Sequence, residues 1–391
     1  MESNTPDYIE QLTSALQASY SQYKDNPSPE HKAKLSDSML KINSFYAQEG
    51  LEKEFGNSLM QLIKLNSPTP SCHLIDSLAG NFYTLVQKIK ERILQQPKIL
   101  DTLFTLMLEL KMNPQSKKYV LLYKSIHPFR KLWKGYIDFC RWWNFENFAT
   151  ADFIIKTGAK MSLAESALIF YTKRLINTDF KEDLAKLTVT FIKNISKHPL
   201  TVYSNFYIAK LLVKLKYDNT LIRRILRPFL ITKAMKPWGW HLMSKTFNCN
   251  EEFIEKFSCL LLALEFGKMF PATIVNDIYL DLAMMFHNIN ELPQAKFFLE
   301  IYLKIRRDAG YKTPDFIQKI THQQWYDATT PLRPDTSFDY KENCRNILRR
   351  TTTADAALYD WLSQDLSTRF PESIQWSQEW YDTMNEGERI F

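Results

Sequence analysis

Basic and aromatic residues alternate between positions 117 and 143, and this stretch has the most potential for chemistry. Lysine and arginine neutralise phosphates, and exposed aromatic rings stack on nucleic-acid bases. The same rings at helical spacing would instead form the buried face of a helix pair. The stretch therefore predicts either a nucleic-acid surface or an aromatic core. Its bases are Lys117, Lys118, Lys124, Arg130, Lys131, Lys134 and Arg141. Its rings are Tyr119, Tyr123, Phe129, Trp133, Tyr136, Trp142 and Trp143.

A second basic cluster consists of Arg223, Arg224 and Arg227. It falls near the end of an expected helix, where positive charge complements the helix dipole. The same three residues would also extend a phosphate-binding surface. Both interpretations stay open on the sequence alone.

The motifs of the common enzyme classes are missing. The chain has no GxxxxGK[ST], GxGxxG, HExxH or GxSxG sequence. None of its seven histidines has an arginine five residues before it, a spacing found in helical defence ribonucleases. We therefore expect no catalytic residue, no cofactor and no metal site. A helical nuclease or toxin without a recognised motif remains an alternative.

Pairs of polar residues have ordinary structural interpretations. Asp277 and Asp281 are four residues apart, which places both carboxylates on one helical face. Paired carboxylates can act as acid and base, but here they are expected to solvate the surface of a helix. Cys249 and Cys259 are expected to be packed thiols.

Cysteine usage and the start of the chain point to a cytoplasmic protein. Five cysteines are scattered without a CxxC pair, which is typical of a reduced compartment. The first seven residues are polar, unlike a signal peptide. The strongest apolar run, 260–264, is far shorter than the ~20 residues of a membrane span.

The elements that must position these residues are helices. Only 9 glycines occur in 391 residues, and no segment alternates apolar and polar residues as a strand does. Apolar stripes predict helices over about 6–24, 35–45 and 51–65. Further on, turn signals recur at Asp218-Asn219, Lys236-Pro237 and Asn288–Asn290, between segments of roughly 12–18 residues. This pattern predicts an all-α fold.

Residues 276–305 carry a repeat signature. Leu282, Ala283, Phe286, Ala295 and Leu299 stand where a tetratricopeptide repeat has its large and small packing residues. Weaker copies upstream place Ala209, Ser244 and Ser258 at the small positions. The segment thus resembles a tetratricopeptide repeat. The resemblance implies an α-solenoid of antiparallel helix pairs with a groove for protein partners. Its expected groove positions are His241, Lys245, Asn276, Tyr279 and Asp281.

A narrower resemblance covers about residues 129–326. It rests on Trp142-Trp143-Asn144-Phe145, Ser162-Leu163-Ala164-Glu165, His198-Pro199, Trp238-Gly239-Trp240 and Trp325-Tyr326, in that order. This order is similar to a bacterial family of tetratricopeptide-like proteins associated with TOTE conflict systems, which act against phages. The resemblance implies a defence role. Members of that family often continue into a small nucleic-acid-binding β-barrel, whereas this chain continues into a Thr/Pro loop, a basic helix near 341–350 and an acidic segment.

The charge is distributed unevenly. The net charge is +7, yet residues 355–391 contain eight acids and two bases, which is −6, so the rest of the chain is +13. This division suggests an anionic partner or an internal electrostatic clamp.

Four regions are expected. They are an N-terminal helical region (1–65), a helical region with the basic and aromatic segment (73–145), tetratricopeptide-like repeats (146–325), and a loop, basic helix and acidic C-terminal segment (326–391). The predicted function is a non-enzymatic scaffold for protein partners, such as an effector encoded nearby, with nucleic-acid binding as the alternative.

Overall fold

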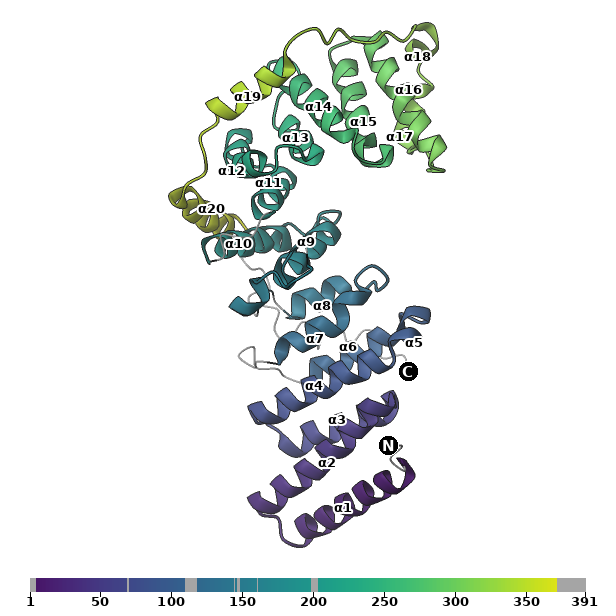
Figure 1. The fold of residues 1–391 in the computed structure, drawn as a ribbon, viewed down its shortest axis with the longest axis vertical. Coiled ribbons are helices and arrows are strands. Elements are labelled where there is room, and N and C mark those ends of the chain that lie inside the picture. The colour runs from purple at the N-terminus through teal and green to yellow at the C-terminus, as the bar shows by residue number, and fades with distance from the viewer. Residues whose placement is uncertain are drawn as a thin grey trace. The chain divides into compact units, whose positions relative to one another are not determined.

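The computed structural model describes residues 5–68, 70–109, 118–143, 145, 148–159, 161–197 and 203–370. Within these ranges every regular element is a helix (Figure 1), as predicted. The chain forms two compact units. Of the described residues, unit 1 holds those up to Arg174, and unit 2 holds those from Leu175 onwards. No helix in the described part is both long and apolar enough to span a bilayer.

In unit 1 the second helix packs on the first, third and fourth, the third packs on the sixth, and the fourth packs on the seventh. The helices of this unit are α1 (Thr5–Asp25), α2 (Pro29–Glu49), α3 (Glu52–Asn66), α4 (Cys72–Lys88), α5 (Lys90–Gln95), α6 (Ile99–Glu109), α7 (Tyr119–Ile126), α8 (Tyr136–Trp143) and α9 (Leu163–Leu175). Short 3-10 turns cover His127–Phe129 and Thr150–Phe153.

Local signals in the sequence determine where α2 begins and ends. Ser28 Oγ accepts a hydrogen bond from the backbone N–H of His31 at 3.2 Å, and Pro29 occupies the first helical position. At the other end Gly50 adopts φ 72°, which a residue without Cβ does at little cost. The helix between these two signals contains the apolar stripe predicted over 35–45.

A buried polar network ties α2, α3 and α4 together. Asn43, which is fully buried, donates to Ser58 Oγ at 2.7 Å and to the carbonyl of Phe55 at 3.2 Å. Asn81 in turn donates to Asn43 Oδ1 at 3.0 Å. A buried amide left without partners would cost about 1–3 kcal/mol, so this network favours a single register of the three helices.

Unit 2 contains α10 (Lys181–Lys197), α11 (Ser204–Lys214), α12 (Asn219–Thr232), α13 (Pro237–Ser244), α14 (Phe253–Gly267), α15 (Ala272–Asn288), α16 (Leu292–Asp308), α17 (Asp315–Thr321), α18 (Gln324–Ala328), α19 (Tyr340–Arg350) and α20 (Ala356–Arg369). From α10 to α16 each helix packs on the next. The predicted breaks at Asp218-Asn219, Lys236-Pro237 and Asn288–Asn290 are confirmed, whereas the predicted break at His198-Pro199 lies outside the described residues.

Small residues lie where helices of unit 2 approach one another. Ala209, Ser244, Ser258, Ala283 and Ala295 all expose 2% or less of their surface. Gly267 shows how close the approach is, because a Cβ built there would lie 2.3 Å from Val275 Cγ1. Any larger side chain at Gly267 would therefore push α15 away from the end of α14.

The C-terminal part of unit 2 returns along earlier helices. In Figure 1, α19 lies beside α14 and α20 beside α10, and both pairs are in contact. The expected helix near 341–350 is confirmed as α19. Residues 356–369, within the expected acidic segment, form the helix α20. Tyr217 Oη donates to Asp365 Oδ2 at 2.6 Å and so holds α20 in place. The remaining acidic residues, from Glu372 onwards, lie outside the described residues.

Candidate functional site

Three of the five expected groove residues meet between α13 and α15. His241 Nε2 lies 2.6 Å from Asp281 Oδ2, and Lys245 Nζ lies 3.4 Å from the same oxygen. His241 and Lys245 are one helical turn apart, so both side chains reach the same carboxylate on the neighbouring helix. The structure thus brings together a cation, an imidazole and a carboxylate from two helices.

The cluster is open to solvent on one side. The side chains of His241, Asp281 and Lys245 are 16%, 30% and 44% exposed. Burial raises the pKa of a carboxyl, but the hydrogen bond from His241 and the positive charge of Lys245 outweigh it. The pKa of Asp281 therefore lies below its ordinary value, and the group is ionised at neutral pH. Of the pair Asp277 and Asp281, Asp281 is engaged by His241 of α13 and by Lys245, which follows that helix.

The other two expected groove residues lie elsewhere. Asn276 is buried, with 4% of its surface exposed. Tyr279 lines a cavity of about 300 Å³ together with residues of α14, α16 and the segment 333–340. The five expected groove residues therefore do not form one surface. Three form the cluster, Asn276 is buried, and Tyr279 lines a separate cavity.

The rings of the basic and aromatic segment form a core. Tyr123, Phe129, Trp133, Tyr136 and Trp143 expose 3% of their surface or less. Edge-to-face contacts, such as Phe104 with Trp133 at 5.6 Å, pack them against α6. These five rings cannot stack on bases, because they are buried in the core. The side chain of Tyr119 lies outside the described residues.

A buried hydroxyl network lies within this core, and no sequence motif indicated it. The hydroxyls of Tyr123 and Tyr136 are 2.5 Å apart, and each lies 2.9 Å from Nδ1 of His127. Burial, with a contribution from the positive charge of Arg130, lowers the pKa of His127 to about 3. The imidazole is therefore neutral, and Nδ1 shares hydrogen bonds with the two tyrosine hydroxyls.

The lysines and arginines of the same segment differ in their exposure and in their contacts. Lys118, Lys131 and Lys134 are exposed, and Lys124 is half-buried at the edge of a cavity of about 330 Å³. Arg130 lies over the Phe170 ring at 3.9 Å, and Arg141 pairs with Asp138 at 2.9 Å. Lys117 lies outside the described residues. Arg130 and Arg141 are thus engaged by the protein itself.

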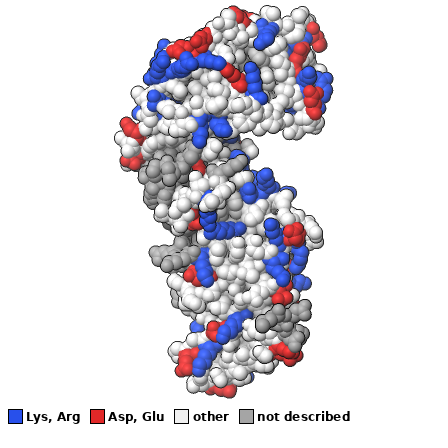
Figure 2. Space-filling view, in the orientation of Figure 1, with Lys and Arg blue, Asp and Glu red and all other residues white. Residues whose placement is uncertain are grey.

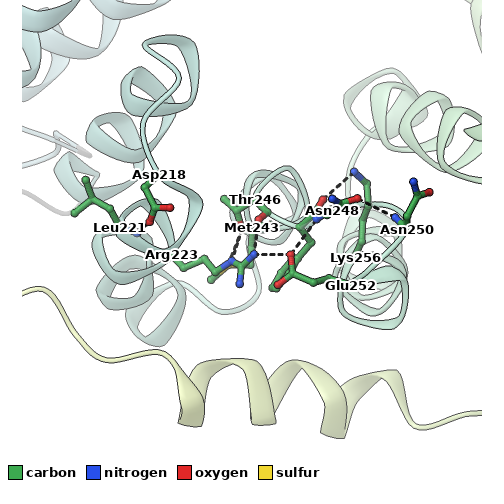
Figure 3. A network of polar contacts seen from close by, with 10 residues as sticks. Asp218, Leu221, Arg223, Met243, Thr246, Asn248, Asn250, Glu252 and Lys256 are labelled. Carbon is green, nitrogen blue, oxygen red and sulfur yellow. Dashed lines mark hydrogen bonds and ion pairs between the residues drawn. The ribbon is translucent and has the colours of Figure 1, made fainter.

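Arg223 connects α12 to the α13–α14 region (Figure 3). Its Nη2 lies 2.9 Å from Glu252 Oε2 and 2.5 Å from the carbonyl of Thr246, and its Nε lies 3.1 Å from Thr246 Oγ1. The guanidinium also covers the Phe247 ring at 3.9 Å. Arg223 therefore satisfies buried acceptors of its own chain, and is not arranged as a free phosphate ligand.

Arg227 and Arg224 hold the C-terminal segment. Arg227 Nε donates to the carbonyl of Leu348 at 2.9 Å, and its Nη1 donates to the hydroxyl of Thr353. Pro228 stands within α12 and has no N–H, so the carbonyl of Arg224 lacks its usual helical partner. The N–H of Ala354 fills this place at 3.3 Å.

Further contacts extend this attachment along unit 2. Lys341 Nζ and Tyr340 Oη lie 2.7 and 2.8 Å from the two oxygens of Glu265, and these hydrogen bonds lower the pKa of that carboxyl. Tyr359 Oη donates to Asn205 at 2.7 Å. In Figure 2, Lys and Arg lie beside Asp and Glu where α19 runs, so α19 does not present a surface of one sign.

The described residues contain no group of three histidine, cysteine or acidic side chains placed to hold a metal. None of the five cysteines, all of which lie in the described part of the chain, forms a disulfide. Cys259 of α14 and Cys344 of α19 are buried against each other, and burial raises the pKa of Cys259 well above its ordinary value. Both thiols are buried in the packing of the two helices, and a raised pKa disfavours the nucleophilic thiolate of Cys259.

Residues 202–344 match a family model described as a domain of unknown function (DUF7017). The match contains α11 to α18 and part of α19, so it includes the His241–Asp281–Lys245 cluster and the cavity beside Tyr279. It excludes unit 1 and α20. No curated protein matches the chain.

Proposed function

We propose that this chain is a non-enzymatic helical-repeat scaffold that binds a protein partner through α13 and α15. In this proposal α11 to α16 form a tetratricopeptide-like solenoid of antiparallel helix pairs. The buried small residues Ala209, Ser244 and Ala283 support it, because close packing of such pairs needs small side chains at those positions.

The observation that carries the proposal is the exposed cluster of His241, Lys245 and Asp281. The polar contacts of the returning C-terminal segment run to α11, α12 and α14, and those of the loop before it run to α16. These contacts do not involve the cluster on α13 and α15, and we propose that a partner binds there. Lys245 Nζ can donate to an acidic group, and Asp281 can accept a second donor on its other oxygen. A partner segment with an acidic group and a hydrogen-bond donor complements this surface.

The setting that we propose is a bacterial conflict system, in the cytoplasm, with an effector protein as the partner. The support is the resemblance of residues 129–326 to the TOTE-associated family, together with five cysteines that form no disulfide. The matching domain model carries no functional description and favours no particular partner.

Purification from cells that make the protein natively tests the scaffold. The wild type is compared with Lys245→Glu, on the proposed surface, and with Lys304→Glu, an exposed residue of α16. We expect one polypeptide at near-stoichiometric amounts with the wild type and with Lys304→Glu, and at least tenfold less with Lys245→Glu. Hydrogen exchange of the complex should show protection in α13 and α15. Equal recovery with both variants would reject this surface.

Nucleic-acid binding stays a second proposal, favoured by the exposed Lys118, Lys131 and Lys134. With five of the rings buried, it would depend mainly on phosphate contacts, so binding should weaken steeply with salt and show little base preference. A gel shift at low salt tests it, and absence of any retained complex would dismiss it. The same incubation with divalent metal tests the motif-less nuclease, which requires cleavage products.

A further inference from the structure

A cavity of about 300 Å³ lies between α14, α16 and the segment that returns after α18. Its walls are apolar and partly aromatic, with Leu261 and Leu264 from α14 and Phe297 and Ile301 from α16. Its rim is formed by residues 333–340, which precede and begin α19. The volume is at the lower end of the ~300–1,000 Å³ of small-molecule sites.

Two cations of this cavity have no ion-pair partner among the described residues. They are Lys268, just after α14, and Arg333, on the rim. The acid of the lining, Glu265, is already engaged by Lys341 and Tyr340 at 2.7 and 2.8 Å. The cavity therefore has an excess of positive charge next to apolar walls.

Tyr279 adds a neutral donor. Its side chain lines the cavity, and its hydroxyl has no hydrogen-bond partner in the described part of the chain. Burial raises the pKa of this phenol, which keeps the proton on the oxygen. A hydroxyl of this kind can donate to an oxygen of a bound molecule.

We propose that this cavity binds a small aromatic organic anion. The flat body of the ligand packs between the apolar residues of α14 and α16, and its carboxylate or phosphate is held by Arg333 and Lys268. Arginine suits this role, because its planar fork binds both kinds of oxyanion with two parallel hydrogen bonds. Since the rim belongs to the segment 333–340, the ligand would also stabilise that segment on α14. This site is separate from the proposed partner surface on α13 and α15.

Calorimetry on the full chain tests the proposal with four probes: phenyl phosphate, 3-phenylpropionate, adenosine monophosphate and inorganic phosphate. We expect at least one aromatic anion to bind, and to bind at least tenfold more tightly than inorganic phosphate. Comparison of the phosphate and carboxylate probes identifies the preferred oxyanion. Hydrogen exchange in the presence of the bound probe should slow in residues 333–340.

Arg333→Ala is the decisive variant, because this exposed residue can be removed without opening the core. It should weaken binding of the aromatic anion at least tenfold. Arg349→Ala, an exposed residue of α19 outside the cavity, should leave binding unchanged. Absence of binding of all aromatic probes at millimolar concentration, equal binding of inorganic phosphate, or binding that survives Arg333→Ala would each overturn the proposal.

Discussion

Replacing Arg227 by methionine should release the C-terminal segment of unit 2 from α12. The guanidinium donates to the carbonyl of Leu348 at 2.9 Å and to the hydroxyl of Thr353. The carbonyl of Leu348 belongs to the last turn of α19, where no helical N–H is left to pair with it. Methionine keeps much of the apolar stem and removes both donors.

The cost follows from these two contacts. A hydrogen bond to a charged group contributes about 1.5–3 kcal/mol, and less where water can replace the partner. Thr353 is exposed and Arg227 is half-buried, so we assign about 2 kcal/mol to the pair of bonds together. Since each 1.4 kcal/mol is a factor of ten, the open state of the segment should become about 30-fold more populated.

Native-state hydrogen exchange at neutral pH measures this change. Amides of α19 and α20 should exchange about 30-fold faster in Arg227→Met, while those of α13 to α16 keep their rates. Trypsin should cut faster after Arg350, which is exposed at the end of α19. Arg349→Met is the matched control, because Arg349 pairs at the surface with Glu342 of its own helix and contributes little. Unchanged exchange in Arg227→Met, or acceleration throughout unit 2, would refute the reasoning.

Three further measurements check other contacts. The pKa of His127 is lowered to about 3, so as pH falls below 6.5 the unfolded chain takes up this proton before the folded one does. Unfolding free energy should therefore decrease as pH falls from 6.5, and NMR should show no titration of this imidazole between pH 5 and 8. Asp281, with its lowered pKa, contributes stability above its unfolded pKa that is lost as pH falls through the folded value. In urea unfolding at pH 7, Asp281→Asn should thus be about 1 kcal/mol less stable than the wild type. This difference in unfolding free energy should shrink as the pH is lowered towards 3. A difference that stays constant would contradict this account. A double-mutant cycle of Arg223→Met and Glu252→Gln should give a coupling of about 1 kcal/mol, and strict additivity would show that the 2.9 Å pair is energetically neutral.

Most of the fold could be predicted because its signals are local. Ser28 and Asp218 cap the helices that follow them, and Pro237 occupies a first helical turn. The spacing of Ala209, Ser244 and Ala283 indicated close helix contacts, and all three are buried. The helix α20 was missed, because its acidic residues obscured a weak apolar stripe that includes the buried Leu362 and Leu366.

The site could be predicted only in part. Helical spacing placed His241 and Lys245 on one face, but it could not show that both reach Asp281 of another helix. Tyr279 was assigned to the same surface on the repeat pattern, and the structure places it in a cavity closed by residues 333–340. That cavity includes a rim far along the chain, so no periodicity could reveal it.

Composition and local spacing by themselves determined that this chain is helical and where most of its helices begin and end. They also indicated which small residues are buried. The reason is that helix formation depends on neighbours within a few residues. Tertiary structure alone decided the role of side chains that can serve either a core or a ligand. The rings of Tyr123 and Trp143 became core, and Arg223 and Arg227 became internal ties. The physical reason is that burial and hydrogen-bond pairing depend on which distant segments meet. For example, the N–H of Ala354 pairs with the carbonyl of Arg224, which Pro228 cannot pair with because it has no N–H.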